Sequence, residues 1–553
     1  MRRSTARGVS GVLLGTMMMI SLASCLPAAG RGRSEREVCV SRVWVADNRD
    51  GTYQNPVLCA DYSDPDVVRV GDDFYLTASS FNCVPGLPIL HSKDLVNWEI
   101  IGHAIPRFAD ARFDTPQHGN GIWAPSIRYH DGWFWVFVGD PDAGILMTKA
   151  KDPAGPWTPL HVVKEGKGLI DTCPLWDDDG NTYLVHAWAN SRAGINSILT
   201  VCRMSPDGTR LLDEGTMVYD GRNGVAPTIE GPKFYQRNGY YYILAPAGGV
   251  KQGWQLALRS KNVFGPYEAK RVLEQGSTDI NGPHQGAWVE LDSGEHWFVH
   301  FQDRGAYGRV VHLNPIRWVD DWPLMGKDLD GNGVGEPVAT FKKPNVGKAH
   351  PITTPVESDE FSSSDLGLQW QWHANPQAGW SSLTARPGWM RLFAIPTPDG
   401  ATNLWPVPNL LLQKFPAPVF TATAKLDCGD LAVGAKAGLL VMGQSYACLS
   451  VEKTSSSLRL TKRTCDDARG GDKETEDGSA VLTAESVLLR VTVADGAVCR
   501  FSFSADGQTF ATIGKPFTAQ PGRWIGAKVG LFCLSGSDPP EDAHADFDWF
   551  RIE

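Results

Sequence analysis

The sequence predicts an all-β protein, a five-bladed β-propeller followed by a β-sandwich. The main observation is a hairpin pattern, Gly beside Asp or Asn and then alternating aromatic and aliphatic residues, that recurs five times between Asn55 and about Val346. No stretch of comparable length keeps a helical period, which argues against an α/β barrel. The hairpin glycines lie about 50 to 60 residues apart, the length of one four-stranded blade: Gly71, Gly132, Gly180, Gly239 and Gly294.

Beyond this repeat the pattern changes, which divides the chain into two domains. A chain of 553 residues is too long for one ordinary core. We assign residues 51–347 to the propeller, residues 348–355 to a linker and residues 356–553 to the sandwich. The second domain has short apolar strands separated by polar turns, as a sandwich does; examples are 438–442, 458–461 and 487–493.

The composition indicates a globular protein with an uncharged ligand. The net charge is -10 and Lys and Arg form no run, which argues against nucleic acid or an anionic membrane as the partner, since both need clustered basic residues. The chain has 20 Trp residues, and flat indole rings suit the faces of sugars as well as protein cores.

The first residues are typical of an export signal. Arg2, Arg3 and Arg7 precede an apolar stretch that is too short to span a membrane as a mature helix. The stretch ends in Leu-Ala-Ser-Cys25, which resembles the lipobox of bacterial lipoproteins. This resemblance implies a signal peptide over residues 1–25, lipidation of Cys25 and a tether over residues 26–50, with simple cleavage as the alternative. The protein is then exported and anchored at the cell envelope, with membrane contact only through the lipid.

A residue that could take part in catalysis or sugar binding lies about seven to ten positions before each hairpin glycine. This is where the first strand of a blade should begin. Because the innermost strands of all blades surround one axis, equivalent positions should converge on a single mouth. The sequence therefore predicts that three carboxylates, a Trp and a His meet there. These residues are Asp64, Trp123, Asp171, Glu230 and His284.

Three convergent carboxylates suit the hydrolysis of glycosidic bonds. That reaction needs a protonated carboxyl group to donate to the leaving oxygen and an ionised one to activate water or attack the anomeric carbon. A third carboxylate can keep the acid protonated, because a like charge nearby disfavours ionisation. No cofactor is required.

The motifs around these positions resemble glycoside hydrolase family 43, whose members are five-bladed propellers that act mostly as β-xylosidases, α-L-arabinofuranosidases and arabinanases. Ser-Asp64-Pro-Asp is similar to the motif that carries the family's general base, which implies Asp64, with Asp61 and Asp66 as competitors. Leu-Ile-Asp171-Thr-Cys-Pro implies that Asp171 tunes the pKa of the acid and orients it. Thr-Ile-Glu230-Gly-Pro-Lys-Phe-Tyr implies Glu230 as the general acid.

The resemblance also implies substrate-binding residues. Trp123, in Trp-Ala-Pro-Ser, and Phe81 would form aromatic walls of the sugar pocket, and Arg309 would bind sugar hydroxyls and offset the acidic cluster. His284 matches the axial histidine that in relatives often lies beside a cation or water, which raises a structural calcium ion as the only candidate metal. The acidic loop over residues 328–336 is interpreted as a Gly-rich turn, not as a calcium site.

Relatives with this mechanism invert the anomeric configuration. The C-terminal region resembles the concanavalin-like sandwich of the family's β-xylosidase branch, which favours exo-acting release of terminal β-D-xylose or α-L-arabinofuranose from xylan, arabinoxylan or arabinan. For the sandwich itself the alternative is a binding module, suggested by Trp370, Trp372 and Trp380. For the whole protein the alternatives are an endo-arabinanase and a surface glycan-binding lipoprotein that kept the propeller but lost turnover, against which the retention of all three carboxylates argues. The loop at Asn82-Cys83 departs from the bulky residues of many xylosidase relatives, so the sequence leaves the choice of pentose open.

Overall fold

The computed structural model describes residues 39–536, 539–540 and 542–553. The predicted signal peptide and its lipidation site, Cys25, lie outside the described residues. Within the described ranges, no helix is long and apolar enough to cross a membrane. Cys39–Glu553 form one compact unit.

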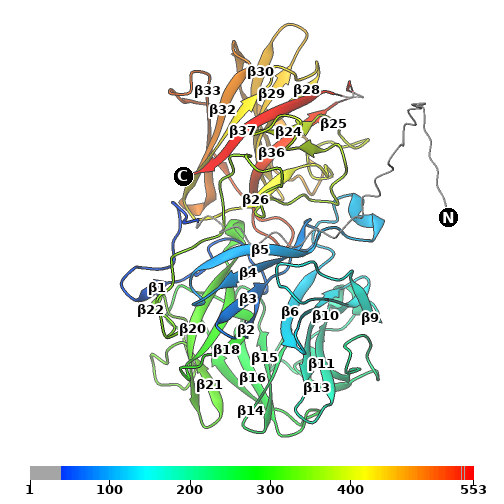
Figure 1. The fold of residues 1–553 in the computed structure, drawn as a ribbon, viewed down its shortest axis with the longest axis vertical. Coiled ribbons are helices and arrows are strands. Elements are labelled where there is room, and N and C mark those ends of the chain that lie inside the picture. The colour runs from blue at the N-terminus through cyan, green and yellow to red at the C-terminus, as the bar shows by residue number, and fades with distance from the viewer. Residues whose placement is uncertain (1–38, 537–538, 541) are drawn as a thin grey trace, which may run out of the picture. The chain divides into compact units, whose positions relative to one another are not determined.

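The first domain is a propeller (Figure 1). Within the described ranges it consists of five four-stranded antiparallel sheets. Each sheet follows chain order, so every blade is a meander. Blade 1 contains β2 (Asp66–Val70), β3 (Asp73–Thr77), β4 (Gly86–Ser92) and β5 (Trp98–Ile105). Blade 2 contains β6 (Trp123–His130), β7 (Trp133–Asp140), β8 (Gly144–Ala150) and β9 (His161–Glu165). Blade 3 contains β10 (Leu169–Trp176), β11 (Thr182–Trp188), β12 (Ile198–Arg203) and β13 (Thr216–Asp220).

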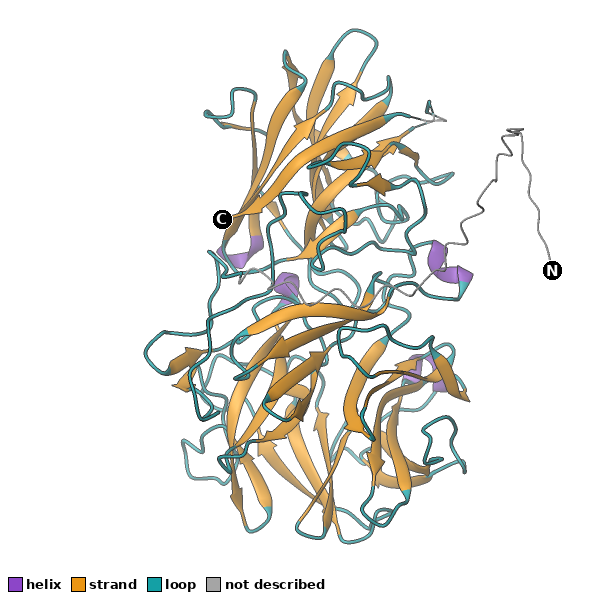
Figure 2. Cartoon of the chain, viewed as in Figure 1, coloured by secondary structure: helices purple, strands orange, loops and turns teal. Residues whose placement is uncertain are grey.

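The last two blades have the same order. Blade 4 contains β14 (Lys233–Arg237), β15 (Tyr240–Ala247), β16 (Trp254–Ser260) and β17 (Glu268–Leu273). Blade 5 contains β18 (His284–Glu290), β19 (His296–Asp303), β20 (Arg309–Val319) and β21 (Trp322–Met325). The short helical turns are η1 (Ala111–Asp114), α1 (Asn190–Ala193), η2 (Gly305–Tyr307) and, in the second domain, η3 (Asp495–Ala497). Strands dominate both domains (Figure 2).

The first strands of neighbouring blades lie against one another, because β2 contacts β6 and β18, and β10 contacts β6 and β14. Apolar clusters fill the spaces between blades, for example Ile89 with Val136 and Val185 with Ile243. Strand β1 (Thr52–Gln54) pairs with β22 (Thr340–Lys342), which joins the two ends of the propeller. The Asn55 amide strengthens this closure, since it donates to the Leu313 carbonyl and accepts from the Leu313 N–H, both at 2.8 Å.

A residue with a positive φ recurs where each blade begins, and in blades 2, 3 and 5 it lies in a β-bulge. A positive φ costs energy for most residues and concentrates at functional sites. The register shifts there in β6, β10 and β18, and in blades 1 and 4 the residue lies just before the first strand. The five residues are Asp64 (54°), Ala124 (38°), Asp171 (58°), Gly231 (58°) and Gln285 (27°).

The five predicted site residues therefore do not occupy strictly equivalent positions. In three blades the predicted residue lies one position before the residue with the positive φ. Asp64 and Asp171 occupy the positive-φ position themselves, whereas Trp123, Glu230 and His284 immediately precede it. A bulge inserts one residue into a strand, so a pattern of alternating residues does not reveal it.

The second domain is a sandwich of two sheets. One sheet has the order β23-β24-β37-β27-β32-β33-β34, with β35 beside β33, and the other has β25-β36-β28-β29-β30-β31, with β26 beside β36. The first contains β23 (Ser381–Ser382), β24 (Met390–Phe393), β27 (Phe420–Asp427), β32 (Ser486–Ala494), β33 (Val498–Ser504), β34 (Ala511–Thr512), β35 (Phe517–Thr518) and β37 (His544–Ile552). The second contains β25 (Ile395–Pro396), β26 (Leu411–Lys414), β28 (Ala435–Met442), β29 (Tyr446–Lys453), β30 (Leu458–Cys465), β31 (Thr475–Leu482) and β36 (Lys528–Ser535).

The Trp residues that suggested a binding module belong to the core of the sandwich. Trp370, Trp372 and Trp380 are 0%, 3% and 4% exposed. Buried indoles have no free face for a sugar ring, so these three do not support a binding module in the sandwich. Nine cysteines in the described ranges, from Cys59 to Cys533, are free thiols.

The two domains share hydrogen bonds. Trp372 pairs with Val84 of the propeller, and the Asn82 amide donates to the His373 carbonyl at 2.7 Å. The Cys83 sulfur accepts from Lys528 Nζ at 3.0 Å. The Asn82-Cys83 loop thus belongs to the contact between the two domains.

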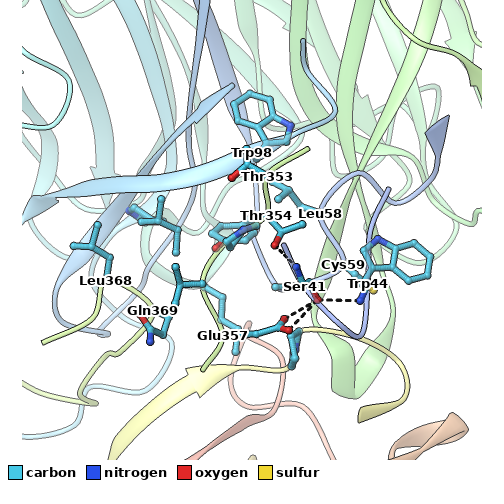
Figure 3. Close-up of a pocket in the computed structure, with 18 of the residues that line it drawn as sticks. Ser41, Trp44, Leu58, Cys59, Trp98, Thr353, Thr354, Glu357, Leu368 and Gln369 are labelled. Carbon is cyan, nitrogen blue, oxygen red and sulfur yellow. Dashed lines mark hydrogen bonds between the residues drawn. The ribbon is translucent and has the colours of Figure 1, made fainter. Parts of the chain in front are cut away.

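Residues 39–50, which the sequence placed in the tether, contact both domains. Ser41 Oγ donates to the Glu357 carboxylate at 2.9 Å, and Lys343 Nζ donates to Asp47 at 2.5 Å. Residues 41–46, 353–357 and 368–371 line a pocket together with blade 1 (Figure 3). Glu357 is the one carboxylate among its lining residues and is already bonded to Ser41, so this pocket lacks the pair of carboxyl groups that glycoside hydrolysis needs.

Candidate active site

The structure brings the predicted polar residues together at the start of the blades. The Gly231 N–H, next to Glu230, donates to Asp171 Oδ2 at 2.7 Å, which joins blades 3 and 4. Arg309 Nη1 lies 2.9 Å from Asp64 Oδ1, which joins blades 5 and 1. His284 Nε2 lies 3.5 Å from Glu230 Oε1.

Asp64 is surrounded by hydrogen-bond donors. Ser79 Oγ donates to its Oδ2 at 2.6 Å, Ser63 Oγ donates to the same oxygen at 2.9 Å, and Arg309 donates to Oδ1. Ser79 is held in turn by the Ala124 N–H, which donates to Ser79 Oγ at 2.7 Å. An ionised carboxylate only accepts hydrogen bonds, so this set of donors matches the ionised form. Ser79 could not be recognised as a site residue from the sequence, because its role depends on the contact between blades 1 and 2.

The two competitors for the role of base have structural partners. Asp61 is 3% exposed and accepts from the Arg309 N–H at 2.8 Å and from the Gly526 N–H at 3.0 Å. Asp66 is fully buried and pairs with Arg128 Nη1 at 2.6 Å. Both carboxylates are therefore committed to contacts within the protein.

Glu230 and Asp171 have environments that favour protonation. Burial, and next the negative charge of Asp171, raise the pKa of Glu230 to about 8, against the opposing charge of Arg309. Burial and then the charge of Asp64 raise the pKa of Asp171. The Gly231 hydrogen bond and the charge of Lys233 favour the ionised form of Asp171, so the proton that this pair retains belongs on Glu230.

The exposure of the three carboxyl groups differs. Asp64 and Asp171 are each 5% exposed, whereas the Glu230 side chain retains 35%. Glu230 is therefore the most accessible of the three carboxyl groups.

Aromatic side chains lie beside these groups. Phe81 meets Trp123 edge to face, with ring centroids 6.3 Å apart, and Trp123 meets Trp524 of the sandwich at the same distance. Phe81 is 3% exposed and supports Trp123, which is itself partly exposed. Trp524 could not be recognised from the sequence, because only the packing of the two domains brings it to Trp123. It is 41% exposed.

Among the described residues neither ring nitrogen of His284 makes a hydrogen bond, although Nε2 lies 3.5 Å from Glu230 Oε1. Burial first, and then the charge of Arg309, lower its pKa to about 3, so the ring is neutral. Calcium prefers oxygen ligands, and a lone imidazole does not match that preference. Across the residues that the structure describes, no group of three or more His, Cys, Asp or Glu side chains is placed to hold a metal ion.

The acidic loop over residues 328–336 is closed by its own backbone. Asp328 accepts from the Gly331 N–H at 2.8 Å, and Asp330 accepts from the Asn332 N–H at 3.1 Å. This arrangement agrees with the interpretation of the loop as a turn.

Comparison with known proteins supports both domains. Residues 53–323 match the model of glycosyl hydrolases family 43, and residues 358–553 match the β-xylosidase C-terminal concanavalin A-like domain. A protein of Xylanibacter ruminicola is 42% identical over 88% of this chain and 87% of its own length. A β-xylosidase of Formosa agariphila is 32% identical over 97% and 96%, respectively.

Two further similarities extend over nearly the whole chain. A non-reducing end α-L-arabinofuranosidase of Bacteroides ovatus is 31% identical over 90% of this chain and 94% of its own. The crystal structure of a xylan β-1,4-xylosidase from Bacillus halodurans has a TM-score of 0.80 and 25% identity, over 90% of this chain and 99% of that one. Because identity above 30% extends over nearly all of the chain and the propeller matches the family model, the chain belongs to family 43 of the glycosyl hydrolases and is a glycoside hydrolase.

Proposed function

We propose that this enzyme removes terminal pentoses, β-D-xylose or α-L-arabinofuranose, from the non-reducing ends of xylan- or arabinan-type chains, with inversion at the anomeric carbon. The observation that carries the proposal is the contrast between two carboxyl groups. Asp64 accepts from three side-chain donors, whereas Glu230 sits beside the charge of Asp171 with a raised pKa.

This contrast supports separate roles for the two groups. Asp64, held as a carboxylate, takes a proton from the water that attacks the anomeric carbon. Glu230, which keeps its proton near neutral pH, gives it to the departing glycosidic oxygen on the other face of the sugar. Asp171 acts through Glu230, since its charge disfavours ionisation of the acid.

Arg309 and Trp123 support the binding of a terminal sugar. The Arg309 guanidinium holds Asp64 in place with one edge and has further N–H donors for hydroxyl groups. Trp123 offers a partly exposed indole next to Phe81. Trp524 stands over Trp123 from the second domain, and a pocket narrowed in this way suits the end of a chain better than its middle.

The relatives named above include both a β-xylosidase and an α-L-arabinofuranosidase, so the proposal covers both pentoses. The test is hydrolysis of nitrophenyl β-D-xyloside and nitrophenyl α-L-arabinofuranoside by the protein and by its Glu230→Gln variant. We expect release of one pentose and a loss of at least about a hundredfold in kcat for the variant. NMR of the first-formed anomer should show inversion.

Two results would contradict this proposal. No turnover together with undiminished binding of xylan by Glu230→Gln would indicate a glycan-binding protein. Internal cleavage of arabinan, with mixed oligosaccharides as the first products, would indicate an endo-enzyme.

We also propose that the protein is exported and anchored through a lipid on Cys25. The Leu-Ala-Ser-Cys25 sequence supports this, as does the basic, apolar segment before it. Labelled palmitate should enter the wild-type protein and not a Cys25→Ala variant, and equal labelling of both would refute the anchor.

A further inference from the structure

A pocket opens beside Arg309, between the propeller and one loop of the sandwich. Its lining residues come from 303–309 in blade 5, from Lys251 in blade 4 and from 521–525 in the sandwich. Arg309 also holds Asp64, so the pocket adjoins the site of water activation. In an exo-acting enzyme the terminal sugar occupies the closed end of the site, and the leaving group extends toward such an opening.

The sandwich loop is fixed in this position by backbone hydrogen bonds. The Gly526 N–H donates to Asp61 at 3.0 Å, and the Ala527 N–H donates to the Ala306 carbonyl at 2.7 Å. A Cβ atom on Gly526 would lie 2.8 Å from the Gly308 nitrogen, so only glycine permits this approach. These contacts therefore hold the loop that carries Arg523 and Trp524 in place.

Arg523 and Trp524 form a continuous surface at the opening. The guanidinium carbon of Arg523 lies 4.3 Å from the centre of the Trp524 ring. The Arg523 side chain also packs on Gly119, where an added Cβ atom would come within 2.2 Å of its Cγ. An exposed indole beside a planar guanidinium matches a sugar ring that carries a carboxylate, because the indole covers the ring face and the guanidinium binds the carboxylate with two parallel hydrogen bonds.

The pocket has an excess of positive charge. Arg523 and Lys251 form no ion pair with any acid in the described part of the chain, and Arg309 is already paired with Asp64. The one acidic lining residue, Asp303, accepts from the Gly305 N–H at 2.9 Å. This local excess contrasts with the net charge of -10 for the whole chain.

The surroundings of Arg523 increase this excess. The charged groups that act on it are Arg469 and Arg192, and burial together with these two charges lowers its pKa. Arg192 has its own partner, Asp142, at 3.0 Å. An anion in the pocket would relieve the repulsion among the cations.

We propose that this pocket is a leaving-group subsite for a hexuronic acid, with Arg523 and Lys251 binding its carboxylate and Trp524 covering its ring. The natural substrate is then an acidic pentosan oligosaccharide, in which the sugar next to the scissile bond carries a uronic acid branch. This inference rests on the proposed function, since it assigns a leaving group to the same site. It also revises the sequence-based expectation of an uncharged ligand.

The test compares xylotriose with xylotriose that carries glucuronic acid on its central xylose. We expect the wild-type protein to have a kcat/KM about tenfold higher on the acidic substrate, the scale of one charge-assisted hydrogen bond. Arg523→Gln should lower kcat/KM on the acidic substrate about tenfold more than on the neutral one. Added salt should also reduce the preference, since ions screen an exposed charge. Arg317→Gln, at an exposed cation outside this pocket, is the matched control and should leave the preference intact.

The subsite would be overturned if the wild-type ratio of kcat/KM on the acidic substrate to kcat/KM on the neutral one were one or below. Equal losses of kcat/KM on both substrates in Arg523→Gln would overturn it as well. Calorimetric titration of Glu230→Gln with the acidic oligosaccharide separates this inference from the proposed function. If nitrophenyl glycosides are not cleaved but the acidic oligosaccharide still binds more tightly than the neutral one, the proposed function fails and the uronic acid site stands. If nitrophenyl xyloside is cleaved and no preference appears in rate or binding, only the subsite fails.

Discussion

Replacing Asp171 with Asn should move the alkaline limit of activity to lower pH. The amide oxygen can still accept the Gly231 hydrogen bond, which measures 2.7 Å, so the change removes a charge and keeps the shape. That charge is the largest contribution after burial to the raised pKa of Glu230, which lies at about 8. A like charge at close range typically shifts a pKa by about one unit or more, equivalent to about 1.4 kcal/mol per unit.

A shift of one unit has a calculable effect on rate. With a pKa near 8, about nine-tenths of Glu230 is protonated at pH 7 and about half at pH 8. With a pKa lowered by about one unit, the protonated fraction falls to about half at pH 7 and about one-tenth at pH 8. The variant should therefore lose about twofold at pH 7 and about fivefold at pH 8 from titration alone.

The assay is the pH profile of kcat/KM on a nitrophenyl glycoside, from pH 5 to pH 9. Asp179→Asn, in an exposed turn of the same blade, is the matched control and should keep the wild-type profile. If Asp171→Asn lowers the rate equally at every pH and leaves the alkaline limit in place, Asp171 orients Glu230 without tuning its proton affinity, and the electrostatic argument is wrong.

Three other substitutions test the remaining parts of the site. Asp64→Asn keeps an oxygen for Ser79 but cannot accept a proton, so kcat should fall by about 10²–10⁴, and a loss below tenfold in steady-state assays would exclude Asp64 as the base. Glu230→Gln should stabilise the fold more at pH 8 than at pH 5. The pKa of Glu230 is raised in the folded state, so the stability that its protonated form contributes below about pH 4 is lost as the pH rises toward 8. Identical gains in melting temperature for the variant at both pH values would refute this. Asp61→Asn places an amide N–H group against the backbone N–H of either Arg309 or Gly526. The free energy of unfolding, measured by chemical denaturation, should therefore fall by about 1–3 kcal/mol. An unchanged free energy of unfolding would show that these hydrogen bonds are dispensable.

Most of the fold could be predicted because a propeller repeats its local pattern. Each blade has a hairpin marked by Gly and aromatic residues, and the distance between hairpins gives the size of a blade. The convergence of Asp64, Asp171 and Glu230 followed from that repeat, since equivalent strands surround one axis. The repeat did not disclose the one-residue displacement at the bulges, because an inserted residue leaves the alternation on either side intact.

The parts of the site that depend on contact between distant segments could not be predicted. Ser79 and Trp524 have no distinguishing neighbours in the sequence, and their roles arise only where blade 2 meets blade 1 and where the sandwich meets the propeller. The Trp residues of the sandwich illustrate the same limit. Trp372 and Trp380 suggested a sugar-binding surface by composition, yet both are buried, while the exposed Trp524 stands at the opening.

The hydrogen bonds of Asp61 connect the second domain to the active site, so this domain is not an independent module. One of its oxygens positions the backbone of Arg309, the residue that holds Asp64, and the other positions Gly526 at the end of the loop that carries Trp524. A single buried carboxylate thus positions both the residue that holds Asp64 and the loop that carries Trp524. Because both oxygens are used, a displacement of the sandwich loop would leave a buried acceptor without a partner, which costs free energy. The position of the sandwich loop and that of Arg309 are therefore maintained by hydrogen bonds to the same side chain.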